Sequence, residues 1–187
     1  MLISKFSGIN LKDQVMDMEK KYEITFPDPY KVFLCKYNGG DTPNTKFKIG
    51  KISSDIRGFY GIGDVRYSLD SIDLEEWLNV KIFPIACDSF GNYIVIGLSK
   101  DSMGKIYFWD HEEENHLVYL AEDMQSFLKS CKSEKISEDA TKSIEEREAA
   151  MIARGRGEYI TDGLRQMWQA EIDKYRNMVQ EKVIIDL

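Results

Sequence analysis

The chain of 187 residues has little of what several classes of protein require. Its cysteines, Cys35, Cys87 and Cys131, are odd in number and widely spaced within apolar sequence. This usage argues against a disulfide framework or a zinc site, and it suits buried free thiols in a reducing compartment. No apolar run approaches the roughly 18 residues that cross a bilayer, and the first residues lack the apolar core of a signal peptide. We therefore expect a cytoplasmic protein with no membrane partner.

Sequence motifs of catalysis are also missing. There is no Gly-x-Ser-x-Gly nucleophile elbow. Gly58 and Gly61-Ile62-Gly63 lack the lysine and the spacing of a phosphate loop, so a turn at the end of a strand explains them better. Paired carboxylates such as Glu75 and Glu76 suit a solvated helix face better than acid–base chemistry. We expect no catalytic centre and no cofactor.

Excess positive charge is absent as well. Lys and Arg number 25 against 32 Asp and Glu, and the net charge of −7 argues against nucleic-acid binding but permits a basic partner. The segment Arg154-Gly155-Arg156-Gly157 is better explained as a hinge between helices than as a phosphate or RNA site. Both histidines, His111 and His116, lie among carboxylates. Metal ligands are usually spaced on rigid elements, so a solvated turn is favoured over a metal site here.

What the sequence does contain is a globular composition with a clear strand pattern. Hydrophobic residues make up 43% and aromatic residues 12% of the chain. Three β-branched and aromatic runs lie within residues 82–110, separated by turn residues at 89–92 and 99–104. They predict an antiparallel meander. Both faces of the run 93–98 are apolar, so this run should be a central strand covered on both sides.

Helical patterns flank the strands. Residues 11–22 have helical apolar spacing behind Asn10, a candidate N-cap. A second helix should begin at Asp28-Pro29 and stop at Asn38-Gly39-Gly40. Strands are expected at 46–49, 57–62 and 117–120, a short acidic helix at 70–78, and a last helix starting at Glu122 or Asp123. This order predicts an α+β fold with a mainly antiparallel sheet and flanking helices.

These segments together resemble the SUKH superfamily, which includes the Smi/Knr-type cell-wall-assembly regulators and many bacterial immunity proteins. The resemblance covers roughly residues 10–131. The matching positions are Tyr30, Phe33, Leu34, Asn38-Gly39-Gly40, Pro84, Ala86, Asp88, Gly91-Asn92, Gly104 and Trp109-Asp110. Most of them have a scaffold rationale, because the glycines turn the chain and the aromatic residues pack. The resemblance implies a protein-binding domain that is not known for catalysis.

The composition changes after Ser133, which predicts a SUKH-like domain over residues 1–133 and a helical C-terminal extension over 134–187. In the extension, Leu164, Trp168, Ile172 and Tyr175 form an apolar stripe on an amphipathic helix. Whether this stripe packs on the domain, on a second copy or on a partner stays open.

The resemblance also implies a function, the neutralisation of a cognate protein toxin by binding it. Many partners of bacterial SUKH proteins are nucleases or deaminases with basic active sites, which an acidic inhibitor can cover. The alternative is a regulatory or scaffold protein of cell-envelope assembly or signalling. Trp77, Trp109 and Trp168 are candidate interface anchors, although Trp109 is more simply explained as core. The carboxylates that we expect to contact the partner are Asp110, Glu112, Glu113 and Glu114, then Asp70, Asp73, Glu75 and Glu76.

Overall fold

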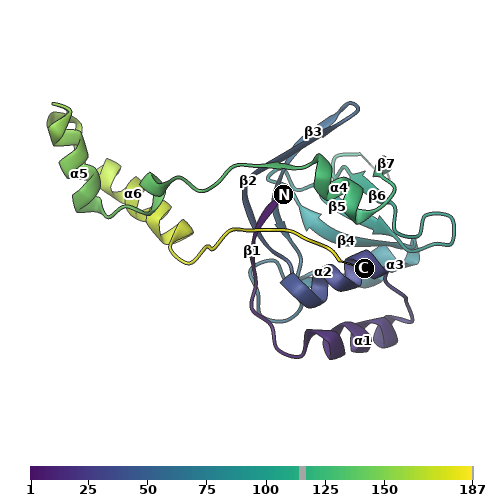
Figure 1. Cartoon of the computed structure of the whole chain (residues 1–187). Coiled ribbons are helices and arrows are strands. Elements are labelled where there is room, and N and C mark those ends of the chain that lie inside the picture. Colours follow the sequence, from purple (N-terminus) through teal and green to yellow (C-terminus); the bar gives the residue numbers. More distant parts are fainter. Residues whose placement is uncertain (114–116, 187) are drawn as a thin grey trace. The chain divides into compact units, whose positions relative to one another are not determined.

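The computed structural model describes residues 1–113 and 117–186, and internal contacts divide the chain into two units. Met1–Glu134 and Gln180–Leu187 form the first, which we call the sheet unit. Lys135–Val179 form the second, the helical unit. Figure 1 shows the elements of both along the chain.

The sheet unit has the α+β architecture that the sequence predicts. Its strands pair in the order β7-β6-β5-β4-β3-β2-β1-β9, while β8 pairs with β2 beside this path. Every pair of these strands is antiparallel. The strands are β1 (Leu2–Lys5), β2 (Gly40–Ile49), β3 (Ile52–Phe59), β4 (Ile82–Cys87), β5 (Tyr93–Gly97), β6 (Ile106–Trp109), β7 (Leu117–Ala121), β8 (Lys132–Ser133) and β9 (Glu181–Lys182).

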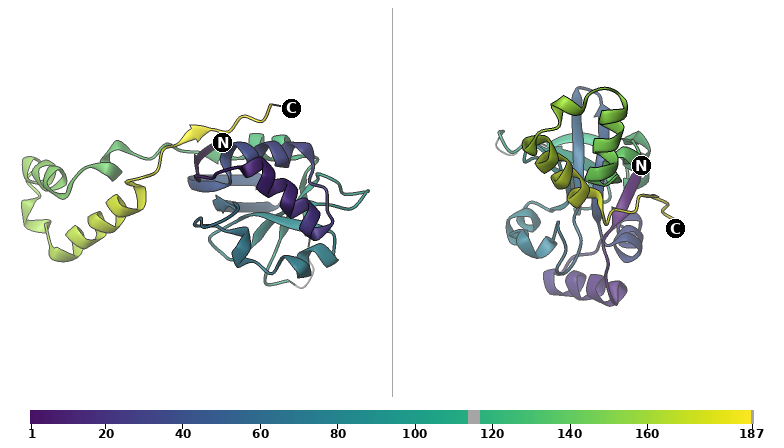
Figure 2. Two further views of the ribbon diagram at one scale, coloured as in Figure 1. Left: turned by 90° about the horizontal axis from the view of Figure 1, so that it is seen from below. Right: turned by 90° about the vertical axis from the view of Figure 1, so that its left-hand side faces the viewer.

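Helices lie on both faces of this sheet. The helices α1 (Leu11–Tyr22), α2 (Asp28–Tyr37) and α4 (Met124–Ser130) lie on one face, and α3 (Leu74–Asn79), preceded by the 3-10 turn η1 (Leu69–Ser71), lies on the other (Figure 2). Successive side chains along a strand point alternately to these two faces of the sheet. Phe108 is buried on the α4 side, with its ring 6.3 Å from that of Phe47, whereas Trp109 faces α3. Strand β5 is accordingly buried along almost its whole length, which confirms its prediction as a central strand.

Aromatic rings fill the core under α2. Tyr30 and Phe33 of this helix are fully buried. The ring of Phe26 lies 4.8 Å from that of Phe83 on β4, and the ring of Phe33 lies 5.1 Å from that of Phe59 on β3. Large rings bury much apolar area each, so these contacts contribute strongly to joining α2 to the sheet.

Asn38 joins three parts of the sheet unit. It ends α2 in the left-handed conformation, with φ 52°, and is fully buried. Its side-chain amide donates to the carbonyl oxygens of Ser7 and Ile62, at 3.0 and 3.1 Å, and its Oδ1 accepts from the Ile62 N–H at 2.8 Å. A Cβ at Gly61 would overlap the carbonyl oxygen of Asn38, so the chain can approach this closely only at a glycine. The motif Asn38-Gly39-Gly40 is therefore a scaffold feature.

Some boundaries differ from the sequence-based expectation. The strands expected at 46–49 and 57–62 are one hairpin, in which β2 already begins at Gly40 and β3 ends at Phe59. The β2–β3 register is irregular between Asp41 and Thr45, which breaks the alternation of side chains there. The first half of β2 therefore lacks the sequence pattern by which a strand is predicted. The helix expected at 70–78 is split into η1 and α3, because the Asp73 side chain accepts from the Glu75 N–H and caps α3. Asn10 is left-handed, with φ 53°, and its side chain makes no capping bond.

The end of the chain returns to the sheet unit. Strand β9 pairs with β1, with Leu2 opposite Lys182. The Tyr37 hydroxyl accepts from the Ile184 N–H at 2.8 Å and donates to the Ile184 carbonyl at 3.2 Å. The Gln180 side-chain amide donates to the Glu134 carbonyl at 3.2 Å, so the two points where the helical unit joins the sheet unit are neighbours. The described residues 180–186, which composition groups with the extension, therefore contact the sheet unit.

The helical unit contains η2 (Glu138–Thr141), α5 (Ile144–Ala153), η3 (Gly157–Tyr159) and α6 (Asp162–Tyr175). Ser143 and Glu146 form a capping box at the start of α5. Gly155, with φ +68°, lies in the break between the two helices, where the sequence predicts a hinge. None of the described helices of the chain has both the length and the hydrophobicity needed to cross a membrane.

Candidate functional site

Three aromatic side chains meet on the α3 face of the sheet. The Trp77 ring of α3 lies 4.9 Å from the Tyr93 ring of β5 and 5.0 Å from the Trp109 ring of β6. The rings of Tyr93 and Trp109, which are opposite each other in the β5–β6 ladder, lie 5.7 Å apart. This cluster holds α3 on the sheet. Trp109 is partly buried and packs against Trp77 and Tyr93, so it contributes to this packing while part of its surface stays accessible.

An apolar groove lies beside this cluster, and we call it the α3–β7 groove. It has a volume of about 560 Å³. Val80 at the end of α3 is 59% exposed and Leu117 at the start of β7 is 40% exposed. The residues that line the groove are Glu76, Trp77, Val80, Ile82, Trp109 and Leu117.

The apolar surface continues along β6 and β7. Tyr107 and Tyr119 are opposite each other in the ladder, on the same face as Trp109 and Leu117, with ring centroids 6.0 Å apart. Tyr119 is 49% exposed. Desolvation, followed by the negative charge of Glu122, raises the pKa of Tyr119, so a carboxylate also lies near this end of the face.

The acidic residues of the second predicted group, Asp70, Asp73, Glu75 and Glu76 around α3, have different roles. Asp73 caps the helix. Asp70 and Glu75 lie near Lys21 of α1, whose pKa is raised first by its hydrogen bond to Tyr22 and also by these two carboxylates. All four carboxylates are exposed, and Glu76 differs from the other three because it lines the α3–β7 groove. The group is therefore not one uniform patch.

The first predicted group, which begins at Asp110, follows Trp109 directly. The Asp110 carboxylate accepts from the Glu112 N–H at 3.0 Å and shapes the turn, while the side chains of Glu112 and Glu113 are exposed. Glu114 lies outside the described residues. Because Trp109 contacts Trp77, the structure brings the turn after β6 and the helix α3 to the same aromatic cluster.

The histidine that the structure describes has a structural partner. The Nδ1 atom of His111 lies 2.8 Å from the Asn92 Oδ1, and its backbone N–H donates to the same oxygen at 3.2 Å. Asn92 itself donates from its backbone and its amide to the buried Asp88 carboxylate. His116 lies outside the described residues, and within residues 1–113 and 117–186 no three His, Cys, Asp or Glu side chains form a group that could hold a metal.

The cysteines of the sheet unit sit in environments that disfavour the thiolate. Burial raises the pKa of Cys131 to about 12, and its thiol donates to the Phe127 carbonyl. Burial also raises the pKa of Cys35 and Cys87. Since the thiolate is the nucleophilic form, none of the three is prepared for covalent catalysis.

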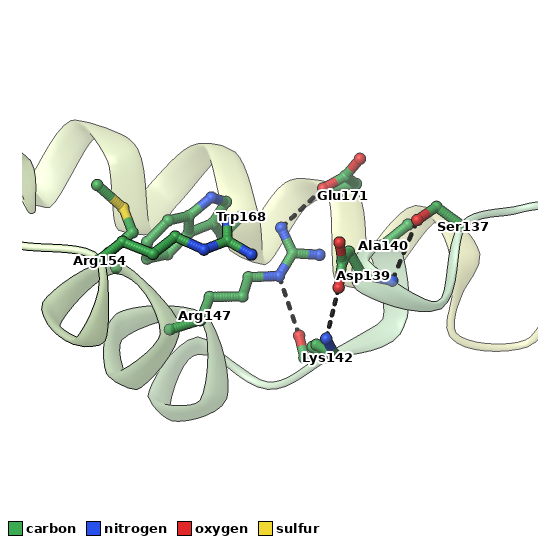
Figure 3. A pocket seen from close by; sticks show the side chains of 10 residues that line it. Ser137, Asp139, Ala140, Lys142, Arg147, Arg154, Trp168 and Glu171 are labelled. Atoms are coloured by element: carbon green, nitrogen blue, oxygen red, sulfur yellow. Dashed lines mark hydrogen bonds and ion pairs between the residues drawn. The ribbon is translucent and has the colours of Figure 1, made fainter. Parts of the chain in front are cut away.

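A second cavity, of about 250 Å³, lies within the helical unit and is centred on Arg147 of α5 (Figure 3). The Arg147 Nη1 donates to Glu171 of α6 at 2.7 Å, its Nε donates to the Lys142 carbonyl at 3.1 Å, and its guanidinium lies 5.9 Å from the Trp168 ring centroid. Lys142 in turn binds Asp139 of η2. These bonds join η2, α5 and α6. The cavity is therefore explained as a gap between packed elements of the helical unit, lined by side chains that hold those elements together.

Sequence reasoning missed the apolar part of the α3–β7 groove. The sequence pattern does not single out Val80, and it predicts Leu117 only as part of a strand. The available signal was the run at 117–120, which is apolar on both faces directly after an acidic segment. An edge strand of this kind leaves one apolar face uncovered unless another element packs on it.

Comparison with known sequences identifies the fold. The model of the SMI1 / KNR4 family (SUKH-1) matches residues 11–130, which is more than half of the chain. The chain belongs to the SMI1 / KNR4 family. It is also similar to the SPbeta prophage-derived uncharacterized protein YokK of Bacillus subtilis (strain 168), with 28% identity over 160 residues that cover 72% of this chain and 81% of that protein. The SUKH resemblance predicted from the sequence is confirmed, and the match ends just before the helical unit begins.

Proposed function

We propose that this SUKH protein is a non-catalytic immunity protein that acts in the cytoplasm and neutralises a cognate protein toxin by binding it. Membership of the SMI1 / KNR4 family supports a role of this kind. The observation that carries the proposal is the contact between Trp77 and Trp109, which brings two acidic segments far apart in sequence to one apolar groove. Exposed apolar surface rimmed by charge is typical of protein-binding sites.

The proposed chemistry is charge mimicry. The active site of a nuclease or of a nucleic-acid deaminase is basic, because it must hold a phosphate backbone. Exposed carboxylates such as Glu76 and Glu112 can occupy the positions of phosphates there. Long-range attraction between the acidic protein and the basic toxin mainly raises the association rate, while the apolar groove supplies buried area that slows dissociation.

The test is protection in cells together with complex formation. The candidate toxin is the modular secreted protein, if any, encoded beside this chain, and its toxic domain is expressed with and without the chain. We expect growth to be rescued and the purified domains to form a stoichiometric complex. A toxin that kills equally in both cases, with no complex between the purified proteins, would refute the immunity role and favour a regulatory or scaffold role in cell-envelope assembly.

A control separates binding from catalysis. An immunity protein that works by occlusion protects in proportion to its amount, so protection should disappear when toxin exceeds it. Protection by a small fraction of one equivalent would contradict the non-catalytic part of the proposal.

A further inference from the structure

Several of the described residues at the α3–β7 groove present apolar surface to solvent. Val80 and Leu117 border it with 59% and 40% of their surface exposed, and Tyr119, at 49%, extends the apolar face along β7. These side chains are adjacent rather than scattered, and contiguous exposed apolar surface of this kind is uncommon on proteins without a partner. We therefore expect a ligand or a partner molecule to cover the groove.

The lining favours a protein side chain over a small metabolite. Pockets for small molecules place several convergent polar groups around an apolar cavity to fix the ligand. Among the lining residues that the structure describes, Glu76 alone carries a charged side chain, and the two indoles add N–H donors. A pocket walled by two tryptophans and three aliphatic side chains suits a bulky apolar anchor of another protein.

The charge around the groove indicates which kind of protein could supply such an apolar side chain. None of the described residues that line the groove is Lys or Arg, whereas Glu76 is one of them, and the exposed carboxylate of Glu112 follows Trp109 in the turn after β6. Lys21, which lies near Asp70 and Glu75, is not one of the residues that line the groove. A second copy of this chain carries the same net charge of −7 and would be repelled. A basic segment is complementary.

We infer that the α3–β7 groove receives one bulky apolar side chain from a partner segment in which Lys or Arg residues flank that side chain. This inference rests on the proposed function, because it names the chemistry of the toxin surface that the protein recognises. The apolar side chain stacks between Trp77 and Leu117, while the flanking cations lie against Glu76 and Glu112. Affinity then requires both the anchor and its charged flanks.

Three short peptides test the inference on the full chain. They are Lys-Lys-Leu-Lys-Lys, Lys-Lys-Ser-Lys-Lys and Glu-Glu-Leu-Glu-Glu, each blocked at both ends, and the readout is the movement of backbone amide and indole N–H signals in NMR titrations at low salt. We expect the first peptide to move the indole signals of Trp77 and Trp109 and the amides of α3 and β7. Removing the leucine should weaken binding about tenfold, the usual effect of losing one buried aliphatic side chain, and the acidic peptide should not bind.

Matched variants complete the test. Val80→Lys should abolish the shifts, whereas Met16→Lys, at a position of α1 that is 57% exposed, should leave them unchanged. Equal binding of the leucine and serine peptides, or shifts centred on another surface, would overturn the inference. Rescue from the toxin without any effect of Val80→Lys would also overturn it while leaving the proposed function intact. Peptide binding without rescue would instead retain the groove and reject the immunity role.

Discussion

The indole rings of Trp77 and Trp109 meet edge to face, with their centroids 5.0 Å apart and their planes inclined by 66°. This contact fixes the short helix α3 against β6, and Glu76 and Asp110 are the chain neighbours of the two tryptophans. The pair therefore has two roles, since it packs the helix and forms one wall of the α3–β7 groove.

Replacing Trp77 by Ala should destabilise the sheet unit. The ring is half-buried, so the expected loss in the free energy of unfolding is about 2 kcal/mol, below the range for a fully buried tryptophan. Urea denaturation followed by circular dichroism measures it. A loss below about 0.5 kcal/mol, typical of surface substitutions, would mean that the cluster does not hold α3.

Asn38 should be sensitive to both its hydrogen bonds and its backbone. Asn38→Ala leaves the Ile62 N–H and the Ser7 carbonyl without a partner and puts alanine in the left-handed conformation, so we expect a loss of about 3 kcal/mol or more. Asn38→Gly loses the same bonds but relieves the strain, and it should be more stable than Asn38→Ala by about 1 kcal/mol. Urea denaturation of both variants measures this difference. Equal stability of the two would show that the left-handed backbone imposes no strain here.

The helical unit should be removable. Because Gln180 and Glu134 are hydrogen-bonded neighbours, replacing residues 135–179 by a short glycine linker should leave the sheet unit folded, with a Tm within about 5 °C of the full chain. A chain that stops at Glu134 should be less stable by about 2 kcal/mol, since it also loses β9 and the Ile184 bonds to Tyr37. Thermal melting of both variants distinguishes them. If the linker variant melts as low as the truncated chain, the helical unit itself stabilises the sheet unit.

Stability should fall in alkali through Cys131. Burial raises the pKa of Cys131 to about 12 in the folded protein, whereas an unfolded cysteine has a pKa of about 8.5. A group with a raised folded pKa contributes stability that is complete below the unfolded pKa and is lost as the pH rises toward the folded one. Cys131→Ala removes this contribution, so the difference in unfolding free energy between wild type and variant should narrow between about pH 8.5 and 11. Chemical denaturation at several pH values measures it, and a constant difference would place the Cys131 thiol in a less buried site.

The sequence predicts elements formed by neighbouring residues well, and it predicts pairings between residues far apart in the chain poorly. The meander is visible because β-branched and aromatic residues such as Tyr93, Ile94 and Phe108 gather in short runs and the turns between the runs carry glycine. The pairing of β1 with β9 joins Leu2 to Lys182, and Glu181-Lys182 has no strand pattern of its own. Its formation depends on contacts far along the chain, which periodicity does not record.

In the candidate site, too, some features are evident from the sequence and others only from the structure. The acidic segments are evident from composition, but the sequence does not show that Trp77 and Trp109 bring them together. Nor does it separate Asp73, which caps a helix, from Glu76, which borders the groove. Both distinctions depend on which way neighbouring side chains point on a short helix.

We propose that a basic toxin is captured at the carboxylates beside the α3–β7 groove. The most direct measurement is the association rate of the toxic domain with Glu76→Lys/Glu112→Lys, from low to high salt, beside Asp17→Lys/Asp101→Lys, which makes the same charge change at exposed positions on α1 and on the β5–β6 turn. We predict that the groove variant associates at least about tenfold more slowly at low salt, and that the effect shrinks as salt screens charges beyond about 8 Å. The control should slow association much less, and both should keep the wild-type Tm. Equal association rates for the two variants at every salt concentration would contradict the claim.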